Sequence, residues 1–278
     1  MSNKIVHGDG VDLAVQIRGA ADGPTVLLLH GYPDTHTVWD GVVERLSDSF
    51  RVVTYDVRGA GASSRPKGRA AYRFPLLMND LRAVVKEVSP DGPVHLVGHD
   101  WGSIQGWEAV TTMPELFASY TSISGPSLDH AGRWTRAHSG TLRGLRQMLH
   151  SWYIVFFHLP VLPILSWRTG VAPRLVAALE RTKTPHFSGT VALDGAYGVN
   201  LYRANILPRM RHPQERVTDV PVQLVVPEDD AFVTPALAAS ALPFASRITR
   251  VSVKAGHWVP VTRPAEIADL VARHAASI

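Results

Sequence analysis

Cysteine is absent from the sequence, and its absence excludes both disulfide bonds and metal sites built from thiolates. Blocks of lysine and arginine interleaved with aromatic residues are also lacking, so nucleic acid is not an expected partner. The first residues, 1–8, contain no apolar stretch of the secretory type. We therefore expect a protein of the reducing cytoplasm.

Long hydrophobic runs are missing as well. The most apolar stretch, residues 152–167, is shorter than the roughly 18–20 residues that a membrane-spanning helix needs, and His158, Pro160 and Pro163 interrupt it. We therefore predict no stable insertion into a membrane. The expected structure of this stretch is a cap helix that packs on the main domain and lines part of a substrate cavity.

Short apolar runs alternate with segments of helical spacing, which predicts an α/β fold with a mostly parallel sheet flanked by helices. Almost continuously apolar runs are typical of parallel strands that helices cover on both faces. The expected buried strands are residues 25–30, 51–56, 94–98, 119–124 and 222–226, with residues 13–18 and 247–253 as outer strands. Helical spacing is present in residues 74–87 and 102–112.

The alternation stops between residues 128 and 217, a span with several prolines and no convincing strand. A segment of this length is too long for a loop in a compact domain, so it indicates an inserted helical subdomain. We predict a core domain formed by residues 1–126 and 218–278, and a helical cap, or lid, formed by residues 127–217.

The stretch VHLVGHDWGS ends a predicted strand on the pattern Gly-x-Asp-x-Gly. This pattern is that of a nucleophile elbow, a sharp turn from a strand into a helix that exposes its central residue. Gly98 and Gly102 allow the flanking backbone to approach closely. Asp100, between His99 and Trp101, stands where serine is usual. Aspartate is also an ordinary N-cap residue, so the hypothesis depends on finding catalytic partners.

Partners follow in the chain order nucleophile, acid, histidine, which this kind of site requires. His257 lies in the stretch AGHWVP, just after the last predicted strand, and Asp229 and Asp230 follow the strand predicted at residues 222–226. The sequence therefore offers a complete nucleophile, acid and base.

An oxyanion hole is predicted from the turn HGYPD, which follows the strand at residues 25–30 and contains His30, Gly31, Tyr32 and Pro33. A sharp turn there can aim the backbone N–H of Tyr32 at the same point as the N–H of Trp101. A simple Gly-Pro turn is the alternative interpretation.

An aspartate at the elbow predicts a reaction at a saturated carbon. Serine attacking such a carbon would leave an ether, whereas a carboxylate leaves an ester that water can cleave. His257 can activate that water, and the oxyanion hole can stabilise the charge that develops on the ester. Asp100 therefore points to alkyl transfer followed by hydrolysis, as in opening an epoxide or displacing a halide.

The stretches HGYP, DVRGAGASS, GHDWGS and GHW together resemble the α/β-hydrolase-fold epoxide hydrolases, over nearly the whole chain. TSISGPSLDH and VPVQLVV are especially similar to the hydrolase half of actinobacterial epoxide hydrolases that are fused to a dehydrogenase-like module. The resemblance implies a monomer or homodimer that converts a small-molecule epoxide into a vicinal diol, with no cofactor and no metal.

The resemblance also implies that two cap tyrosines hold the epoxide oxygen. Tyr153 precedes an aromatic-Phe-x-x-Pro run and Tyr202 precedes an arginine, as the two tyrosines of the family do. Tyr120 and Tyr197 are the nearest other candidates.

For the acid, the family pattern places aspartate five residues before a proline, which selects Asp230 over Asp229 because Pro235 follows at that distance. Some relatives carry the acid after the preceding strand, where this chain has Ser124-Gly125-Pro126 and no carboxylate before Asp129.

Two other functions stay open. A haloalkane dehalogenase uses the same nucleophile but binds the leaving halide with two N–H donors. Trp101 could be one donor; the second is commonly an Asn where this chain has Tyr32, although Trp134 or Trp152 could replace it. A non-catalytic ligand-binding module on the same fold is the other alternative, and turnover would exclude it.

The predicted cap carries an uneven charge. Residues 128–217 contain twelve Lys or Arg and four Asp or Glu, a net charge of +8, whereas the rest of the chain has a net charge of −4. A solvated basic face is one interpretation. The other is that the basic cap, beside the apolar stretch at residues 152–167, favours anionic amphipathic substrates such as epoxy fatty acids, or brief contact with an anionic membrane.

Overall fold

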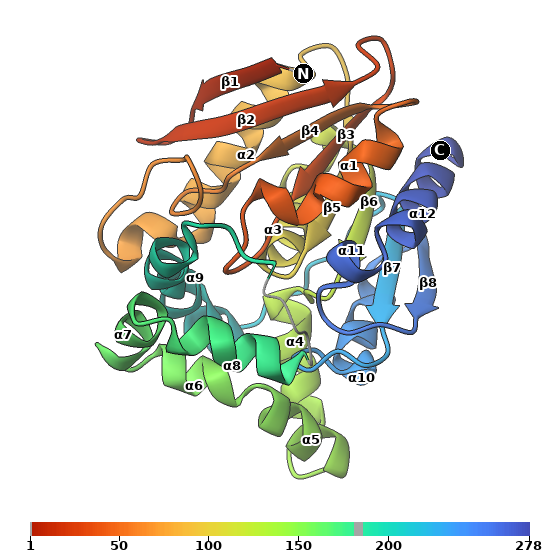
Figure 1. Cartoon of the computed structure of the whole chain (residues 1–278). Helices are drawn as coiled ribbons and strands as arrows, with labels where there is room; N and C mark the ends of the chain where they lie inside the picture. The colour runs from red at the N-terminus through yellow and green to blue at the C-terminus, as the bar shows by residue number, and fades with distance from the viewer. Residues whose placement is uncertain (1, 181–185) are drawn as a thin grey trace.

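The computed structural model describes residues 2–180 and 186–278, and within them helices flank a sheet and form a separate group at one end of it (Figure 1). The described strands are ordered β1-β2-β4-β3-β5-β6-β7-β8. Strand β2 is antiparallel to β1 and to β4, and all other neighbours are parallel. The strands are β1 (Ser2–His7), β2 (Asp12–Gly19), β3 (Thr25–Leu29), β4 (Arg51–Tyr55), β5 (Val94–His99), β6 (Phe117–Ile123), β7 (Val222–Pro227) and β8 (Ile248–Val253). The predicted mostly parallel α/β architecture is confirmed.

Strand β3 shows why a strand covered on both faces is mainly apolar. Leu27 and Leu29 belong to the hydrophobic core on one face of the sheet, and Val26 and Leu28 belong to the core on the other face. Successive strand residues point to opposite faces, so such a strand buries side chains from consecutive positions.

Helices of the main domain cover both faces of the sheet. The helices α2 and α3 contribute to the core that contains Leu27, and α1 and α12 contribute to the core that contains Val26. The main-domain helices are α1 (Asp40–Leu46), α2 (Phe74–Val88), α3 (Trp101–Thr112), α10 (Pro235–Ala238), α11 (Val259–Thr262) and α12 (Pro264–Ala276), with short 3-10 helices η1 (His36–Trp39), η2 (Arg69–Tyr72), η3 (Pro114–Leu116) and η4 (Ala239–Phe244).

One edge of the sheet differs from the sequence prediction. Residues 13–18 were expected to form an outer strand, but β2 is the second strand and β1 forms that edge. Only Val6 of β1 is buried, so this exposed edge strand carries almost no hydrophobic signal. The other predicted outer strand, β8, does lie at the opposite edge.

Between β6 and β7 the described residues contain helices and no strands (Figure 1). The helices are α4 (Leu128–Ala137), α5 (Leu142–His150), α6 (Trp152–Phe157), α7 (Leu162–Arg168), α8 (Val171–Leu179) and α9 (Val191–Arg211). Figure 1 shows them beyond the ends of the sheet to which β7 and β8 point. A parallel α/β sheet places its ligand site at this end, so the cap lies over the expected site.

The single cap helix predicted for residues 152–167 is wrong, because this stretch forms the two helices α6 and α7. Pro160 lies between them and Pro163 lies in the first turn of α7. A proline cannot donate to a preceding turn, so it is tolerated at a helix start and breaks a helix elsewhere. Within the described ranges, no helix combines the length and the apolar character that crossing a bilayer requires.

Candidate active site

Asp100 lies between β5 and α3, with φ of 51° and ψ of −120°. A positive φ is rare for residues other than glycine, so the turn is strained at the residue predicted to react. The flanking glycines make the turn possible. A Cβ on Gly98 would lie 2.5 Å from the carbonyl oxygen of Gly102, and a Cβ on Gly102 would collide with the carbonyl oxygen of Leu29.

The backbone N–H of Tyr32 points at this carboxylate and donates a hydrogen bond to Asp100 Oδ1 at 2.7 Å. Trp101 is the first residue of α3, so its own N–H has no partner within the helix. The structure thus places one predicted oxyanion-hole residue, Tyr32, in the loop after β3 and the other, Trp101, at the start of α3, directly after Asp100.

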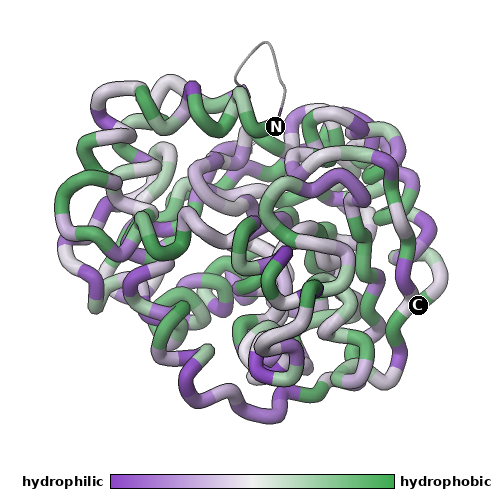
Figure 2. The backbone as a smooth tube through the Cα atoms, turned by 90° about the horizontal axis from the view of Figure 1, so that it is seen from below, coloured by the Kyte–Doolittle hydropathy of each residue, from purple (hydrophilic) through white to green (hydrophobic). Residues whose placement is uncertain are grey.

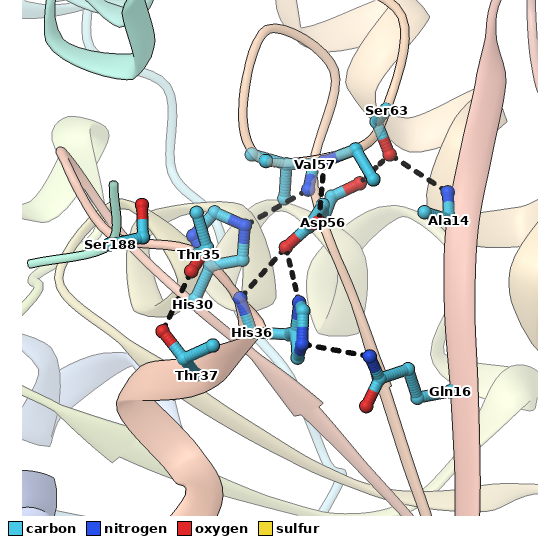
Figure 3. Close-up of polar contacts among 12 residues, drawn as sticks. Ala14, Gln16, His30, Thr35, His36, Thr37, Asp56, Val57, Ser63 and Ser188 are labelled. Carbon is cyan, nitrogen blue, oxygen red and sulfur yellow. Dashed lines mark hydrogen bonds and ion pairs between the residues drawn. The ribbon is translucent and has the colours of Figure 1, made fainter. Parts of the chain in front are cut away.

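His30 holds the turn that carries Tyr32 (Figure 3). The backbone N–H of Val57 donates to His30 Nε2 at 3.0 Å. His30 Nδ1 therefore carries the ring hydrogen and donates it to the carbonyl oxygen of Gly31 at 2.8 Å. Pro33 follows Tyr32 through a cis peptide bond. His30 is a positioning residue of the HGYP turn and has no contact with the reacting carboxylate.

Asp56, from the stretch DVRGAGASS, is the centre of a second part of the same network (Figure 3). Its Oδ1 accepts hydrogen bonds from the backbone N–H and the ring Nδ1 of His36, both at 2.8 Å, and its Oδ2 accepts the N–H of Ala62 at 2.8 Å. Burial acts to raise the pKa of Asp56, but the hydrogen bonds from His36 together with the charges of His30 and His36 outweigh it and lower the pKa. The buried carboxylate thereby joins the loop after β4 to the loop after β3.

His257 contacts both candidate carboxylates. Its Nδ1 lies 3.0 Å from each oxygen of Asp230, and its Nε2 lies 3.5 Å from Asp100 Oδ2. Asp230 Oδ1 also accepts the backbone N–H groups of Phe232 and Val233, at 2.8 and 2.9 Å. Asp230 is buried whereas Asp229 is exposed. Of the two neighbouring acids, the structure places Asp230 beside the histidine.

The electrostatics of these three groups are coupled. Burial acts to lower the pKa of His257, but the charge of Asp230 and the hydrogen bonds to Asp100 and Asp230 raise the pKa well above its ordinary value. Burial acts to raise the pKa of Asp230, but the charge and hydrogen bond of His257 lower it. The free site therefore holds an imidazolium between two carboxylates.

His99, the residue before the nucleophile, is fully buried. Burial and then repulsion by His257 lower the pKa of His99 to about 4, so the ring is neutral. Its Nε2 lies 2.9 Å from the carbonyl oxygen of His257 and donates to it. His99 thus fixes the backbone that carries His257.

Tyr153 of α6 and Tyr202 of α9 line a cavity together with Asp100 and His257. Their ring centroids are 5.9 Å apart. Burial, and then the negative charge of Asp100, raise the pKa of both hydroxyls. Both phenols therefore keep their protons at neutral pH and can act as hydrogen-bond donors.

The other two tyrosines considered from the sequence lie elsewhere. The hydroxyl of Tyr120 donates to the carbonyl oxygen of Ser103 at 2.7 Å, inside the main-domain core. Tyr197 is half-buried and packs against the same core from α9.

A second apolar cavity also contains Asp100. Ile104, Leu128 and Met210 are among its lining residues, whereas Trp152, Phe156 and Leu175 line the first cavity. Asp100, Tyr153, Tyr202 and Phe232 belong to both. A carbon atom bound at Asp100 can therefore carry one apolar substituent into each cavity.

Two carboxylates near His257, the buried Asp34 and the half-buried Glu180, were missed by the sequence analysis. Asp34, in the turn HGYPD, accepts the indole N–H of Trp258 at 2.9 Å and lies 3.1 Å from His186 Nε2. The position of Asp34 directly after HGYP could have identified it from the sequence. Glu180, at the end of α8, lies beside the residue before His257, because a Cβ on Gly256 would be 2.6 Å from Glu180 Oε2. Burial raises the pKa of Glu180, and nothing in the cap sequence marks this residue.

Residues 2–180 and 186–278 contain no group of three or more His, Asp or Glu side chains arranged to hold a metal ion.

Comparison with known proteins identifies the family of the fold. Residues 24–264 match the model of the alpha/beta hydrolase fold family. The chain is also similar in structure to a mutant epoxide hydrolase from Bacillus megaterium, solved in complex with its product (R)-3-[1]naphthyloxy-propane-1,2-diol. That match has a TM-score of 0.84 and 22% identity, and covers 98% of this chain and 100% of the other.

Curated relatives are similar over most of this chain. The chain is 37% identical to the probable oxidoreductase EphD of Mycobacterium tuberculosis, over 98% of this chain and 49% of that protein. It thus spans about half the length of that relative. It is 27% identical to epoxide hydrolase 3 of Mus musculus, over 94% of this chain and 73% of that protein.

Proposed function

This chain belongs to the α/β-hydrolase fold family, and on that basis we propose that it is an epoxide hydrolase that forms a covalent ester on Asp100. The observation that carries the proposal is the carboxylate at the nucleophile elbow, with His257 Nε2 3.5 Å from one oxygen and two protonated tyrosines lining the same cavity. The similarity to proteins named epoxide hydrolase supports it.

In the first step the two oxygens of Asp100 have different roles. Oδ1 is held by the N–H of Tyr32, which leaves Oδ2 to attack a ring carbon of the epoxide. The new carbon–oxygen bond forms as the bond from that carbon to the ring oxygen breaks. Tyr153 or Tyr202 gives its proton to the leaving oxygen, and the other hydroxyl donates a hydrogen bond to it. The product of this step is a hydroxyalkyl ester.

Ester formation switches His257 into a base. The ester has no negative charge, so the part of the raised pKa of His257 that depends on Asp100 is lost. The imidazolium gives its proton to the tyrosinate that the first step leaves, and the neutral ring then accepts a proton from water. The resulting hydroxide attacks the ester carbonyl carbon, while the N–H groups of Tyr32 and Trp101 stabilise the oxyanion. Collapse breaks the bond to the diol oxygen, which takes the proton of the new carboxyl group, and leaves a water-derived oxygen in Asp100 and an imidazolium at His257.

The paired cavities favour epoxides that carry an apolar substituent on each ring carbon. The lining of both cavities is mainly aromatic and aliphatic, and both meet at Asp100. Epoxides within a fatty chain fit this description, whereas a terminal epoxide would leave one cavity empty and forgo the hydrophobic stabilisation that burial there supplies.

The test is to trap the ester. His257→Gln removes the base and preserves the alkylation step, so intact-mass spectrometry after exposure to an epoxide should show the addition of one substrate mass, mapped by peptide analysis to Asp100. Asp100→Asn should form no diol and gain no mass. In a single turnover of wild-type enzyme in ¹⁸O water, the label should enter Asp100 and appear in the diol only in later turnovers. Direct labelling of the first diol would contradict a covalent ester.

A second candidate, haloalkane dehalogenase, is favoured by one observation. The indole N–H of Trp101 is buried without a hydrogen-bond partner among the described residues, and it lies beside Tyr202, with ring centroids 5.0 Å apart. Such a donor could bind a leaving halide. Parallel assays of diol formation from styrene oxide and from a long-chain epoxy fatty acid, and of bromide release from 1-bromobutane, separate the two activities. Absence of turnover with all three substrates would leave a ligand-binding module.

A further inference from the structure

The helix α5 exposes the side that a surface helix normally buries. Leu142, Leu145 and Leu149 follow the i, i+3, i+7 spacing of an apolar stripe, yet their exposed fractions are 85%, 49% and 66%. The residue that α5 does bury is polar: Gln147 donates to the carbonyl oxygen of Phe232 at 2.9 Å and accepts the N–H of Thr234 at 3.0 Å. The leucine stripe of α5 therefore has no partner in the described chain.

The exposed apolar surface continues across the cap. Of the nineteen exposed large apolar side chains of the described residues, thirteen fall between positions 142 and 179. Consecutive helices from α5 to α8 contact one another, which makes the surface continuous. Figure 2 views the molecule from the side on which Figure 1 shows the cap, and hydrophobic segments recur along the helices there. The cap face is defined here as the exposed side chains Leu142, Leu145, Met148, Leu149, Trp152, Val155, Leu159, Val161, Leu162, Leu165, Val171, Leu175 and Leu179.

The charged side chains on the helices that carry the cap face have one sign. Residues 130–179 contain six arginines and no Asp or Glu. Four of them, Arg143, Arg146, Arg168 and Arg174, are exposed on the helices that carry the cap face. None of these four makes an ion pair with another residue in the described part of the chain.

The cap face also reaches the mouth of the first cavity. Trp152, Leu175 and Leu179 are exposed members of the cap face and line the cavity that contains Asp100. An apolar molecule can therefore pass from the surface to Asp100 along apolar side chains.

We propose that the cap face binds the surface of an anionic phospholipid bilayer, with its leucines among the acyl chains and its arginines at the headgroups. Apolar side chains combined with basic ones are what an interfacial helix uses to lie in a bilayer surface. A second copy of the chain is a poorer occupant, because two faces that each carry arginines and no acids repel each other. Bound in this way, the cavity would open toward the lipid and take lipophilic epoxides from it, a role that rests on the proposed function.

The binding experiment uses the whole chain and vesicles. Co-sedimentation with vesicles of phosphatidylglycerol and phosphatidylcholine is compared with sedimentation on phosphatidylcholine alone, at low and high salt. We expect binding to the anionic vesicles that weakens as salt screens the arginines. Arg143→Gln with Arg146→Gln should weaken binding by about fivefold for each arginine removed. Arg250→Gln, an exposed arginine on β8, is the matched control and should bind as the wild type does.

The apolar part of the face is tested by Leu142→Ser with Leu149→Ser, which should weaken vesicle binding at least tenfold, by roughly the loss of two buried aliphatic side chains. Ile5→Ser removes a comparably exposed side chain on β1, far from the cap in Figure 1, and should have no effect. Leu142, Leu149 and Ile5 do not line either of the cavities that contain Asp100. Unchanged turnover of styrene oxide and an unchanged melting temperature therefore show that the variants are folded.

Three results would overturn the proposal: equal sedimentation with neutral and anionic vesicles, no sedimentation at all, or unchanged binding by both double variants. Sedimentation velocity that shows a dimer lost in Leu142→Ser with Leu149→Ser would assign the face to a second copy instead. Asp100→Asn should sediment with vesicles as the wild type does. If Asp100→Asn binds vesicles in this way and the wild type turns over no epoxide, the proposed membrane binding is supported and the proposed reaction is wrong.

Discussion

At the scale of single residues, the two cap tyrosines are the features that separate epoxide opening from other reactions of an aspartate nucleophile. Both hydroxyls keep their protons because burial and Asp100 raise their pKa. We predict that Tyr153→Phe or Tyr202→Phe lowers the rate of ester formation by roughly 10–10³-fold, and that the double variant is far slower, because one and then both donors to the leaving oxygen are lost. The measurement is single-turnover alkylation in the His257→Gln background. Tyr197→Phe is the control, and unchanged rates in both single variants would favour the dehalogenase.

The charge balance of the site leads to a second prediction at this scale. Asp100→Asn should lower the pKa of His257, since a negative charge and a hydrogen bond that favour the imidazolium are removed. Asp229→Asn, next to Asp230 but exposed, should change it little. NMR titration of ¹⁵N-labelled histidine measures both. If His257 titrates near its ordinary value in the wild type and is unaffected by Asp100→Asn, the proposed switch from imidazolium to base is wrong.

The same shift affects stability. The folded-state pKa of His257 is above its unfolded value, so the three-group site stabilises the fold fully below the unfolded pKa, and this stabilisation is lost as the pH rises through the folded pKa. The pKa of Asp230 is lowered, so its contribution is present above the unfolded pKa and is lost as the pH falls through the folded pKa. The difference in unfolding free energy between the wild type and His257→Gln should therefore shrink toward alkaline pH in urea titrations.

Much of the site could be predicted from single residues because local backbone geometry requires them. Gly98 and Gly102 are needed where a Cβ would collide with a carbonyl oxygen, so the elbow is visible in sequence. His257 and Asp230 follow strands, where side chains reach the end of the sheet. Glu180 reaches the same site from the cap through tertiary packing, and such packing leaves no local pattern.

At the scale of elements, the loop after β3 depends on a carboxylate from the loop after β4. We predict that Asp56→Ala lowers the unfolding free energy by about 2–4 kcal/mol, because the N–H groups of His36 and Ala62 lose their buried acceptor. Ester formation should slow as well, since the loop also carries Tyr32. Asp48→Ala, at an exposed site after α1, is the matched control. Urea denaturation and single-turnover rates test both parts, and a variant as stable as wild type would contradict the network.

Elements were predictable in proportion to how completely they are buried. Strands such as β3, β5 and β7 are buried along almost their whole length and are rich in Val and Leu, so the sequence pattern identifies them. The edge strand β1 has one buried residue, and the break between α6 and α7 depends on the positions of two prolines within an otherwise apolar run. In both cases the structure of the segment depends more on the residues that surround it in the fold than on its own composition.

At the scale of the whole molecule, the cap and the main domain share one hydrophobic core. Phe157, Trp167 and Tyr202 from the cap belong to the same cluster as Leu27 and Leu77 from the main domain. The basic cap also forms an ion pair with an acidic residue of the main domain. Arg209 of α9 contacts Glu108 of α3 and, within the cap, Asp129 of α4. Part of the cap charge is therefore neutralised at its base, whereas the arginines near the cap face are not.

This shared core predicts that the chain unfolds in one step. Asp129→Ala removes one of the two buried carboxylates that pair with Arg209 and Arg216, leaves Glu108 as the other, and should lower the unfolding free energy by about 3 kcal/mol. The calorimetric transition should move to lower temperature and stay single. Asp269→Ala, exposed on α12, is the control. Two separate transitions, in the wild type or the variant, would mean that the cap unfolds independently.

The cap also leaves and rejoins the main domain at β6 and β7, which are neighbouring strands in the sheet. An insertion between adjacent strands can be exchanged for another while the sheet and the elbow stay in place, so this arrangement lets evolution vary the range of substrates, provided that the new cap keeps tyrosines at the positions of Tyr153 and Tyr202. A contact with the oxyanion-hole turn sets a further limit. The hydroxyl of Tyr32 donates to the carbonyl oxygen of Gly195 in α9 at 2.9 Å, while its backbone N–H holds Asp100. A grafted cap that offers no acceptor at this point would shift the very residue that orients the nucleophile, so successful chimaeras should be those that supply one.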